Sequence, residues 1–334
     1  ATGGRLTATQ RLRRQAREVL AGMGVTEVQT LPFLSQADLD RLGLPAGDPR
    51  RRTLRLANPL SEEAPELRTT LLPGLAEVAR RNLARGLDGV AVHELGAVFL
   101  PDPGGSGGLK TSPPEDRGQE LPAEPLTLGV LLAGQAPAGR HDDPRRPFDF
   151  ADVKGLVEGL VAALGVPGVG YRAEEPLPFH PGRCAAVLLE DRPVGLLGQL
   201  HPRVAAACEL PAAAFAVELE LAPLLAAVPG MRPAATPSPY PELSFDVAFL
   251  VPPGVAASAL EDALREAGGD LLARLTLFDA YQGSPLPPGH RNLAYRVALQ
   301  AADRTLTDAD GAAVRDRMAT LAAERTEAVL RSAG

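Results

Sequence analysis

Two histidines and two cysteines that lie within 29 residues of one another suggest a zinc site in this sequence. Their spacing lacks the C-x2-C and H-x3-5-H pairs that structural zinc sites use, and both histidines precede prolines in predicted turns. No neighbouring sequence supplies a base for a nucleophilic thiol, so we interpret the cysteines as small core residues and predict no metal site. The four residues are His180, Cys184, His201 and Cys208.

Arginines could instead bind the phosphates of a nucleic acid, and several lie on one predicted helix. Apolar residues recur at helical spacing from Thr9 to Met23, and Gly24 follows in the usual C-terminal position. The charge could bind nucleic acid or could be a solvated helix face in an arginine-rich chain, and the sequence leaves both interpretations open. The arginines are Arg11, Arg13, Arg14 and Arg17, with Arg5 just before the helix.

The overall charge limits what kind of binding is possible. The chain has 34 Lys+Arg against 41 Asp+Glu, a formal net charge of -7, so any RNA site must be local rather than a general cationic surface. Apolar runs are far shorter than the roughly 20 residues that span a bilayer, and no membrane partner is expected. Two cysteines cannot form a disulfide framework and no segment has the layout of a signal peptide, so we predict a cytoplasmic protein.

The elements that position these residues indicate two domains in 334 residues. Five prolines fall in residues 228–241, which gives a first module over 1–228, a Pro-rich linker over 229–241 and a second domain over 242–334. Strands and helices follow a mixed order in the first module. We therefore predict an α+β fold, with an antiparallel sheet flanked by helices.

Several elements of the first module are predicted from periodicity and turn residues. The predicted segments are a strand over Val25 to Phe33, a helix from Pro73 to Gly86, a strand over Val90 to Leu100, a Gly/Pro-rich surface loop over 101–125 and a helix over Asp152 to Leu164.

The second domain has the order βαββαβ, which is typical of a ferredoxin-like fold. The predicted segments are a strand from Phe245 to Val251, a helix from Val255 to Ala267, strands over Leu272 to Tyr281 and 292–300, a helix that starts at a capping box of Thr307 and Asp310, and a last strand from Thr326 to Leu330.

Long strings of this sequence resemble the C-terminal half of the bacterial phenylalanyl-tRNA synthetase beta subunit. The resemblance covers nearly the whole chain in the same order. The strings are ANPLSEEAPELRTTLLPGLAEVARRNLARG (57–86), VHELGAVF (92–99), FDFADVKGLVEGLV (148–161), FHPGRCAAVLLEDRPVGLLGQLHP (179–202) and LFDAYQGSPLPPGHRNLAYRVALQAADRTLTD (277–308).

The resemblance implies a catalytic-like module with the class II synthetase fold, followed by a ferredoxin-fold anticodon-binding domain. Adenylate formation needs arginines that bind the ATP phosphates, and carboxylates that hold Mg²⁺. Where the family's second motif reads Phe-Arg-x-Glu, this chain reads Phe99-Leu100-Pro101-Asp102. Where the third motif has a Gly-rich strand and an arginine, it has Phe215 to Glu220. We therefore expect a non-catalytic module that holds no cofactor, with ATP and Mg²⁺ used only by the assembled enzyme.

The resemblance also implies the partners. We expect an alpha subunit, bound through the first helix and strand in a two-alpha, two-beta assembly, and tRNA(Phe). The alternative is a free-standing synthetase-like paralogue that binds RNA or protein without an alpha subunit. The chain begins at Ala1 without Met, and we expect the native protein to extend further at this end.

Four residues of the second domain are the candidate anticodon contacts: Phe278, Tyr281, Arg291 and Arg296. Alternation over 292–300 puts Arg296 on the face opposite to the apolar set that begins at Leu293, so Arg296 should project toward RNA. The alternative for each aromatic residue is core packing. The family's arginine before the aspartate of the first strand is absent from Ser244-Phe245-Asp246, and we expect an RNA contact or an ion pair to be lost there.

Overall fold

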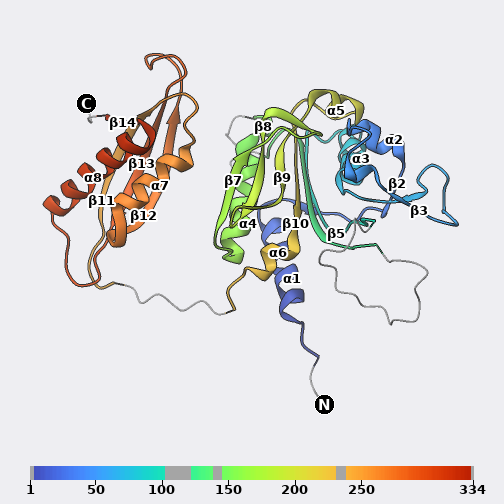
Figure 1. The fold of residues 1–334 in the computed structure, drawn as a ribbon, viewed down its shortest axis with the longest axis horizontal. Coiled ribbons are helices and arrows are strands. Elements are labelled where there is room, and N and C mark those ends of the chain that lie inside the picture. The colour runs from blue at the N-terminus through green and yellow to red at the C-terminus, as the bar shows by residue number, and fades with distance from the viewer. Residues whose placement is uncertain (1–3, 102–121, 138–144, 231–237, 332–334) are drawn as a thin grey trace. The chain divides into compact units, whose positions relative to one another are not determined.

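The computed structural model describes residues 4–101, 122–137, 145–230 and 238–331, so most of the loop predicted over 101–125 lies outside the described residues. The chain divides into two compact units, residues 1–232 (unit 1) and residues 233–334 (unit 2) (Figure 1). Among the described residues, no helix is long and apolar enough to cross a membrane.

Unit 1 is built on a seven-stranded sheet of order β1-β5-β6-β10-β9-β8-β7. All neighbours in this sheet are antiparallel except β1 and β5, which are parallel. The predicted antiparallel sheet is thus confirmed. The strands are β1 (Thr26–Glu27), β5 (Gly89–Ala97), β6 (Leu126–Gly134), β7 (Val169–Ala173), β8 (Phe179–Leu189), β9 (Arg192–Leu200) and β10 (Ala214–Glu220).

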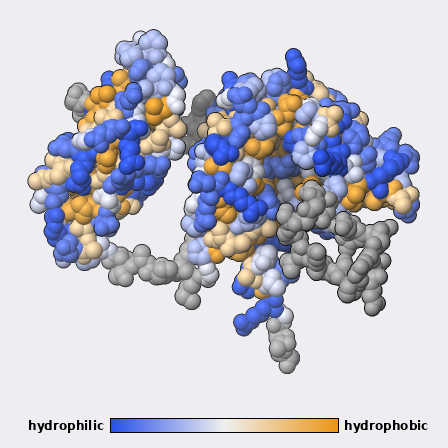
Figure 2. Space-filling view, viewed as in Figure 1, coloured by the Kyte–Doolittle hydropathy of each residue, from blue (hydrophilic) through white to orange (hydrophobic). Residues whose placement is uncertain are grey.

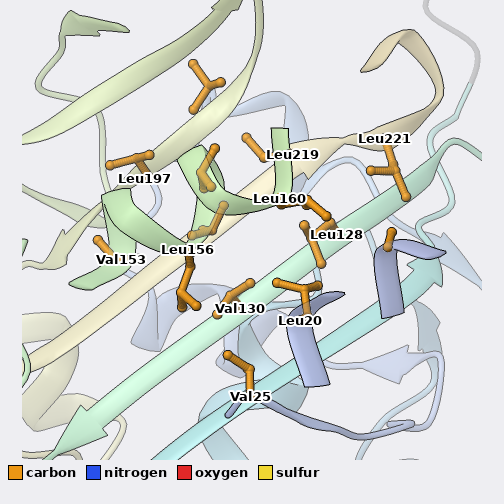
Figure 3. Close-up of a cluster of buried hydrophobic side chains, with 14 of the residues drawn as sticks. Leu20, Val25, Leu128, Val130, Val153, Leu156, Leu160, Leu197, Leu219 and Leu221 are labelled. Atoms are coloured by element: carbon orange, nitrogen blue, oxygen red, sulfur yellow. The ribbon is translucent and has the colours of Figure 1, made fainter. Parts of the chain in front are cut away.

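Helices cover both faces of this sheet, because its strands carry apolar residues on both sides. On β6, Leu128 and Val130 belong to one core cluster, and Leu131 and Ala133 to the other. The first cluster packs α1 (Ala8–Gly22), α4 (Phe150–Leu164) and α6 (Leu221–Ala226) onto the sheet, and Figure 3 shows these side chains meeting.

The opposite face is covered by three other helices and a small sheet. The second core cluster contains residues of α2 (Gln36–Arg41), α3 (Leu72–Ala84) and α5 (Pro202–Ala207). The small sheet has the order β2-β4-β3. Its strands are β2 (Phe33–Leu34), β3 (Leu54–Arg55) and β4 (Glu66–Leu67), and a short 3-10 helix spans Pro49–Arg51.

The two longest helices of unit 1, α1 and α4, begin and end close to where the sequence predicts. The α4 helix starts at a capping box of Asp149 and Asp152 and ends at Gly165, which has φ 69°. A residue with positive φ commonly ends a helix, and glycine adopts this conformation without steric cost. The predicted helices Thr9 to Met23 and Asp152 to Leu164 are confirmed to within two residues.

The strand predicted over Val25 to Phe33 is confirmed only over its first residues. Only Thr26 and Glu27 pair in register with β5, and β2 starts at Phe33 in a different sheet. Between them the Thr30 amide donates to the Glu94 side chain (3.3 Å) rather than to a backbone carbonyl of β5. Pro32 has no amide hydrogen to donate, so this segment cannot continue the ladder.

Unit 2 has the order βαββαβ and an antiparallel sheet of order β12-β13-β11-β14, which confirms the ferredoxin-like prediction. Both helices lie on one face of the sheet (Figure 1). Its elements are β11 (Leu243–Val251), α7 (Ala257–Gly268), a 3-10 helix (Gly269–Leu271), β12 (Leu272–Tyr281), β13 (Arg291–Leu299), α8 (Asp308–Thr326) and β14 (Val329–Arg331).

Candidate nucleic-acid interface

The sheet of unit 2 has one face covered by helices and one face that we call the open face. The helix-covered face holds the core, which contains Leu293, Tyr295, Val297 and Leu299 of β13. Strand alternation therefore puts Arg296 on the open face, as the sequence predicts. In the ladder, Arg296 lies between Asp246 of β11 and Thr276 of β12.

Arg296 and Asp246 form a two-point ion pair across these strands. Nε and Nη2 of Arg296 donate to Oδ1 and Oδ2 of Asp246, each at 2.9 Å. The hydrogen bonds and the positive charge of Arg296 lower the pKa of Asp246, and the same contacts raise the pKa of Arg296. Both side chains are exposed, so the pair adds little to stability. Its main effect is to fix the position of the Arg296 side chain.

The aromatic candidates lie on β12 and are exposed instead of being packed in the core. Phe278 is 51% exposed and Tyr281 44%. A bulge between Leu277 and Asp279 shifts the register, so that Tyr281 pairs with Asn292 on the open face. Without that extra residue, Phe278 and Tyr281 would lie on opposite faces.

Arg296 also contacts Phe278, which joins three strands into one small site. The guanidinium carbon of Arg296 lies 5.3 Å from the centroid of the Phe278 ring, a cation–π distance. The Tyr281 hydroxyl donates to the Ser284 carbonyl, which orients its ring at the end of the strand. The open face thus offers aromatic rings and a fixed guanidinium, groups that stack on unpaired bases and donate hydrogen bonds to their edges.

Two other positions differ from the sequence expectations. Arg291 has the same parity as Leu293 and donates from Nη2 to the Val255 carbonyl, so it is not brought together with the other three candidates. Phe245 packs against the core, with Arg315 of α8 lying 5.2 Å from its ring centroid. Position 245 therefore faces the helices, so an arginine there would add no group to the open face, and the expected loss of an RNA contact does not follow from the structure.

Unit 2 has more acidic than basic residues, unlike a general RNA-binding surface. Residues 238–334 contain nine Arg and thirteen Asp+Glu. On the side shown in Figure 2, hydrophilic and hydrophobic residues are intermixed over α7 and α8. The open face is therefore suited to base stacking and hydrogen bonds more than to binding by the number of cations.

The four metal-site candidates of unit 1 are not arranged as a metal site. His180 and His201 stack with ring centroids 6.2 Å apart, while burial raises the pKa of Cys184 to about 12 and also raises that of Cys208. In the described part of the chain, no group of three or more His, Cys, Asp or Glu is placed to hold a metal ion.

The arginine-rich helix α1 is partly neutralised by its own neighbours. Arg14 pairs with Glu18 at 2.7 Å, and Arg17 pairs with Glu27 at 2.7 Å. Arg11 donates to the Leu6 carbonyl at 2.8 Å. These contacts support the interpretation of a solvated helix face over that of a phosphate-binding surface.

Unit 1 contains a buried ion pair that the sequence does not predict. Arg68 and Glu94 are 2.8 Å apart, with side chains 8% and 4% exposed. Arg68 also donates to the Ala97 carbonyl (2.9 Å), and the Thr30 hydroxyl donates to Glu94 (2.6 Å). The partners come from segments far apart in the sequence, so no local motif could predict the pair.

A second carboxylate, that of the half-buried Glu218, supports the start of α3. The Thr70 hydroxyl (2.7 Å) and the Leu71 amide (2.8 Å) both donate to its Oε1. Glu218 and Glu94 flank Gly129 in the ladder, and a Cβ on Gly129 would lie 2.7 Å from Leu75 of α3. The two carboxylates thus hold the segment that packs α3 against the sheet.

The comparisons with known proteins agree over both units. The family described as "Phenylalanyl tRNA synthetase beta chain CLM domain" matches residues 1–221, and "Ferredoxin-fold anticodon binding domain" matches residues 238–331. Among solved structures, a pyrrolysyl tRNA synthetase from Desulfitobacterium hafniense overlaps 65% of this chain and 68% of its own at 17% identity. Its TM-score of 0.47 is too low to support a conclusion.

Three similar relatives are each named phenylalanine–tRNA ligase beta subunit. That of Symbiobacterium thermophilum is 43% identical over 91% of this chain and 32% of its own length. The Moorella thermoacetica relative is 41% identical over 96% and 38%, and the Streptomyces avermitilis relative is 40% identical over 98% and 41%. The chain therefore spans only a third to two fifths of the length of these relatives.

Proposed function

Because this chain belongs to the phenylalanyl-tRNA synthetase beta chain family, we propose that it is a non-catalytic portion of phenylalanine-tRNA ligase. In this proposal it assembles with an alpha subunit in a two-alpha, two-beta enzyme and binds the anticodon of tRNA(Phe). ATP and Mg²⁺ serve the active site of the assembled enzyme and are not held by this chain. The compartment is the cytoplasm, where tRNA is aminoacylated.

The open face of unit 2 is the observation that supports anticodon binding. Phe278 and Tyr281 are large, exposed and on the same face as Arg296. Unpaired bases stack on such rings, and the alternative of core packing does not account for side chains that are about half exposed. We infer that Arg291 supports the loop near Val255 and does not bind RNA.

The positions of the two class-defining motifs support a non-catalytic role. Leu100 lies in a bridge with Ala123 and offers no charge to an ATP phosphate. Glu218, in the strand of the third motif, is used to hold the start of α3. Neither position supplies the cation that adenylate formation requires.

Exchange of pyrophosphate into ATP tests whether this chain is catalytic without the alpha subunit. We expect the purified chain to show no phenylalanine-dependent exchange, and to co-purify with a bacterial alpha subunit when both are expressed together. Robust exchange by the chain alone would contradict the non-catalytic role. Persistent failure to co-purify would favour the free-standing paralogue.

A further inference from the structure

The Asp246–Arg296 pair determines which part of the guanidinium is left for a ligand. Both contacts to Asp246 use the side of the group that carries Nε and Nη2. Within the described part of the chain, Nη1 has no hydrogen-bond partner. The end of the group that carries Nη1 therefore remains a free pair of donors. Its geometry fits two neighbouring acceptors, such as those on the edge of a purine.

The Phe278 ring fixes the same guanidinium from a second direction. Arg296 lies over this ring at 5.3 Å while Asp246 holds it from the neighbouring strand. An arginine on an exposed strand would otherwise sample many rotamers, and a two-point contact with a planar partner removes most of that freedom. The three residues come from three different strands of the sheet.

We propose that Asp246 is a positioning residue for RNA binding, which holds Arg296 over Phe278 so that its free end hydrogen-bonds to an unpaired base. The proposal rests on the anticodon-binding function above and goes beyond it. It predicts the opposite of the effect on RNA binding that net charge alone would predict. Removing the Asp246 carboxylate makes the open face more positive, yet it weakens RNA binding, because a mobile arginine no longer presents its donors to the base.

A double-mutant cycle on the whole chain tests the role of Asp246. The probe is a fluorescein-labelled tRNA(Phe) transcript, and binding is measured by anisotropy at several salt concentrations. We expect Asp246→Ala to weaken binding about fivefold, comparable to Arg296→Ala, and the double variant to be no weaker than either single variant. Asp246→Asn, which keeps an acceptor for Arg296, should restore part of the affinity.

A matched ion pair on the other side of unit 2 provides the control. Glu266 of α7 pairs with Arg325 of α8 at 2.8 Å, with both side chains about as exposed as those of Asp246 and Arg296. Glu266→Ala causes the same change in net charge and should not weaken RNA binding. Thermal unfolding of each variant should match the parent chain, which excludes a loss of fold as the cause.

The outcomes separate this inference from the proposed function. Tighter or unchanged binding by Asp246→Ala, or additive losses in the cycle, would overturn the positioning role while the anticodon function stands. If the parent chain does not bind tRNA(Phe) at all, both are overturned.

Discussion

The Arg68–Glu94 pair is a buried ion pair of unit 1 whose loss should be strongly destabilising. Arg68→Met leaves the Glu94 carboxylate buried without its cation. An unpaired buried charge is strongly destabilising, so we expect the free energy of unfolding to fall by about 3 kcal/mol or more. Urea denaturation measures the change. Arg14→Met breaks a pair in which both side chains are well exposed and should have little effect, and equal losses in the two variants would contradict the account.

Glu218 should make the stability of unit 1 depend on pH. Burial raises its pKa above the ordinary value of 4.5, so in this range the folded chain binds more protons than the unfolded chain. The contribution of Glu218 is then largest below about pH 4.5 and is lost as the pH rises through the raised pKa.

The variant Glu218→Gln isolates this effect, because glutamine keeps an oxygen that accepts from Thr70 and Leu71. Its unfolding free energy relative to the parent should increase as the pH is raised from about 4.5. Urea denaturation over a pH series checks this, with Glu220→Gln as a control for removing a carboxylate from the same strand. A difference that does not vary with pH would argue against a raised pKa.

For single residues, the sequence predicts the face of the sheet only where strand alternation determines it. The parity of β13 correctly puts Arg296 opposite Leu293. The contact between Arg296 and Asp246 joins residues that are far apart in the sequence, and it depends on the register of two strands. The bulge that brings Tyr281 to the face of Phe278 leaves no recognisable motif, so it could not be predicted.

Among the elements, α8 carries a capping box that the sequence predicts and the structure confirms. The Thr307 side chain accepts from the Asp310 amide, and the Asp310 side chain accepts from the Thr307 amide. We expect Thr307→Ala to lower the free energy of unfolding by about 1 kcal/mol, because it leaves a helix amide without its acceptor.

Chemical denaturation of Thr307→Ala and Thr320→Ala separates capping from side-chain loss. Thr320 is exposed in the middle of α8, and alanine is the better helix former there. Thr320→Ala should therefore be neutral or slightly stabilising. A similar loss in both variants would mean that the cap contributes little.

Helices are predicted better than short strands because their signal is local. Periodicity and caps define α1 and α4 without any partner. A strand ends where its neighbour stops pairing, and β1 stops after two residues although Val and Thr continue beyond it. The sequence therefore overestimates this strand.

At the scale of the whole molecule, the α+β class and the order of the two folds follow from the sequence. Each unit has buried clusters of its own, with the core of unit 2 built only from residues beyond Leu243. The linker over 229–241 remains a prediction, since residues 231–237 lie outside those that the structure describes. Which helices cover which face of the large sheet could not be predicted, because it depends on how the strands pair in three dimensions.

Anticodon recognition is the central claim, and one binding measurement tests it most directly. The whole chain is titrated against two tRNA(Phe) transcripts that differ only in the three anticodon bases, at the same salt concentration. We predict that the transcript with its own anticodon binds about tenfold more tightly, since base stacking and edge contacts carry the recognition. Equal affinity for the two transcripts would contradict the account.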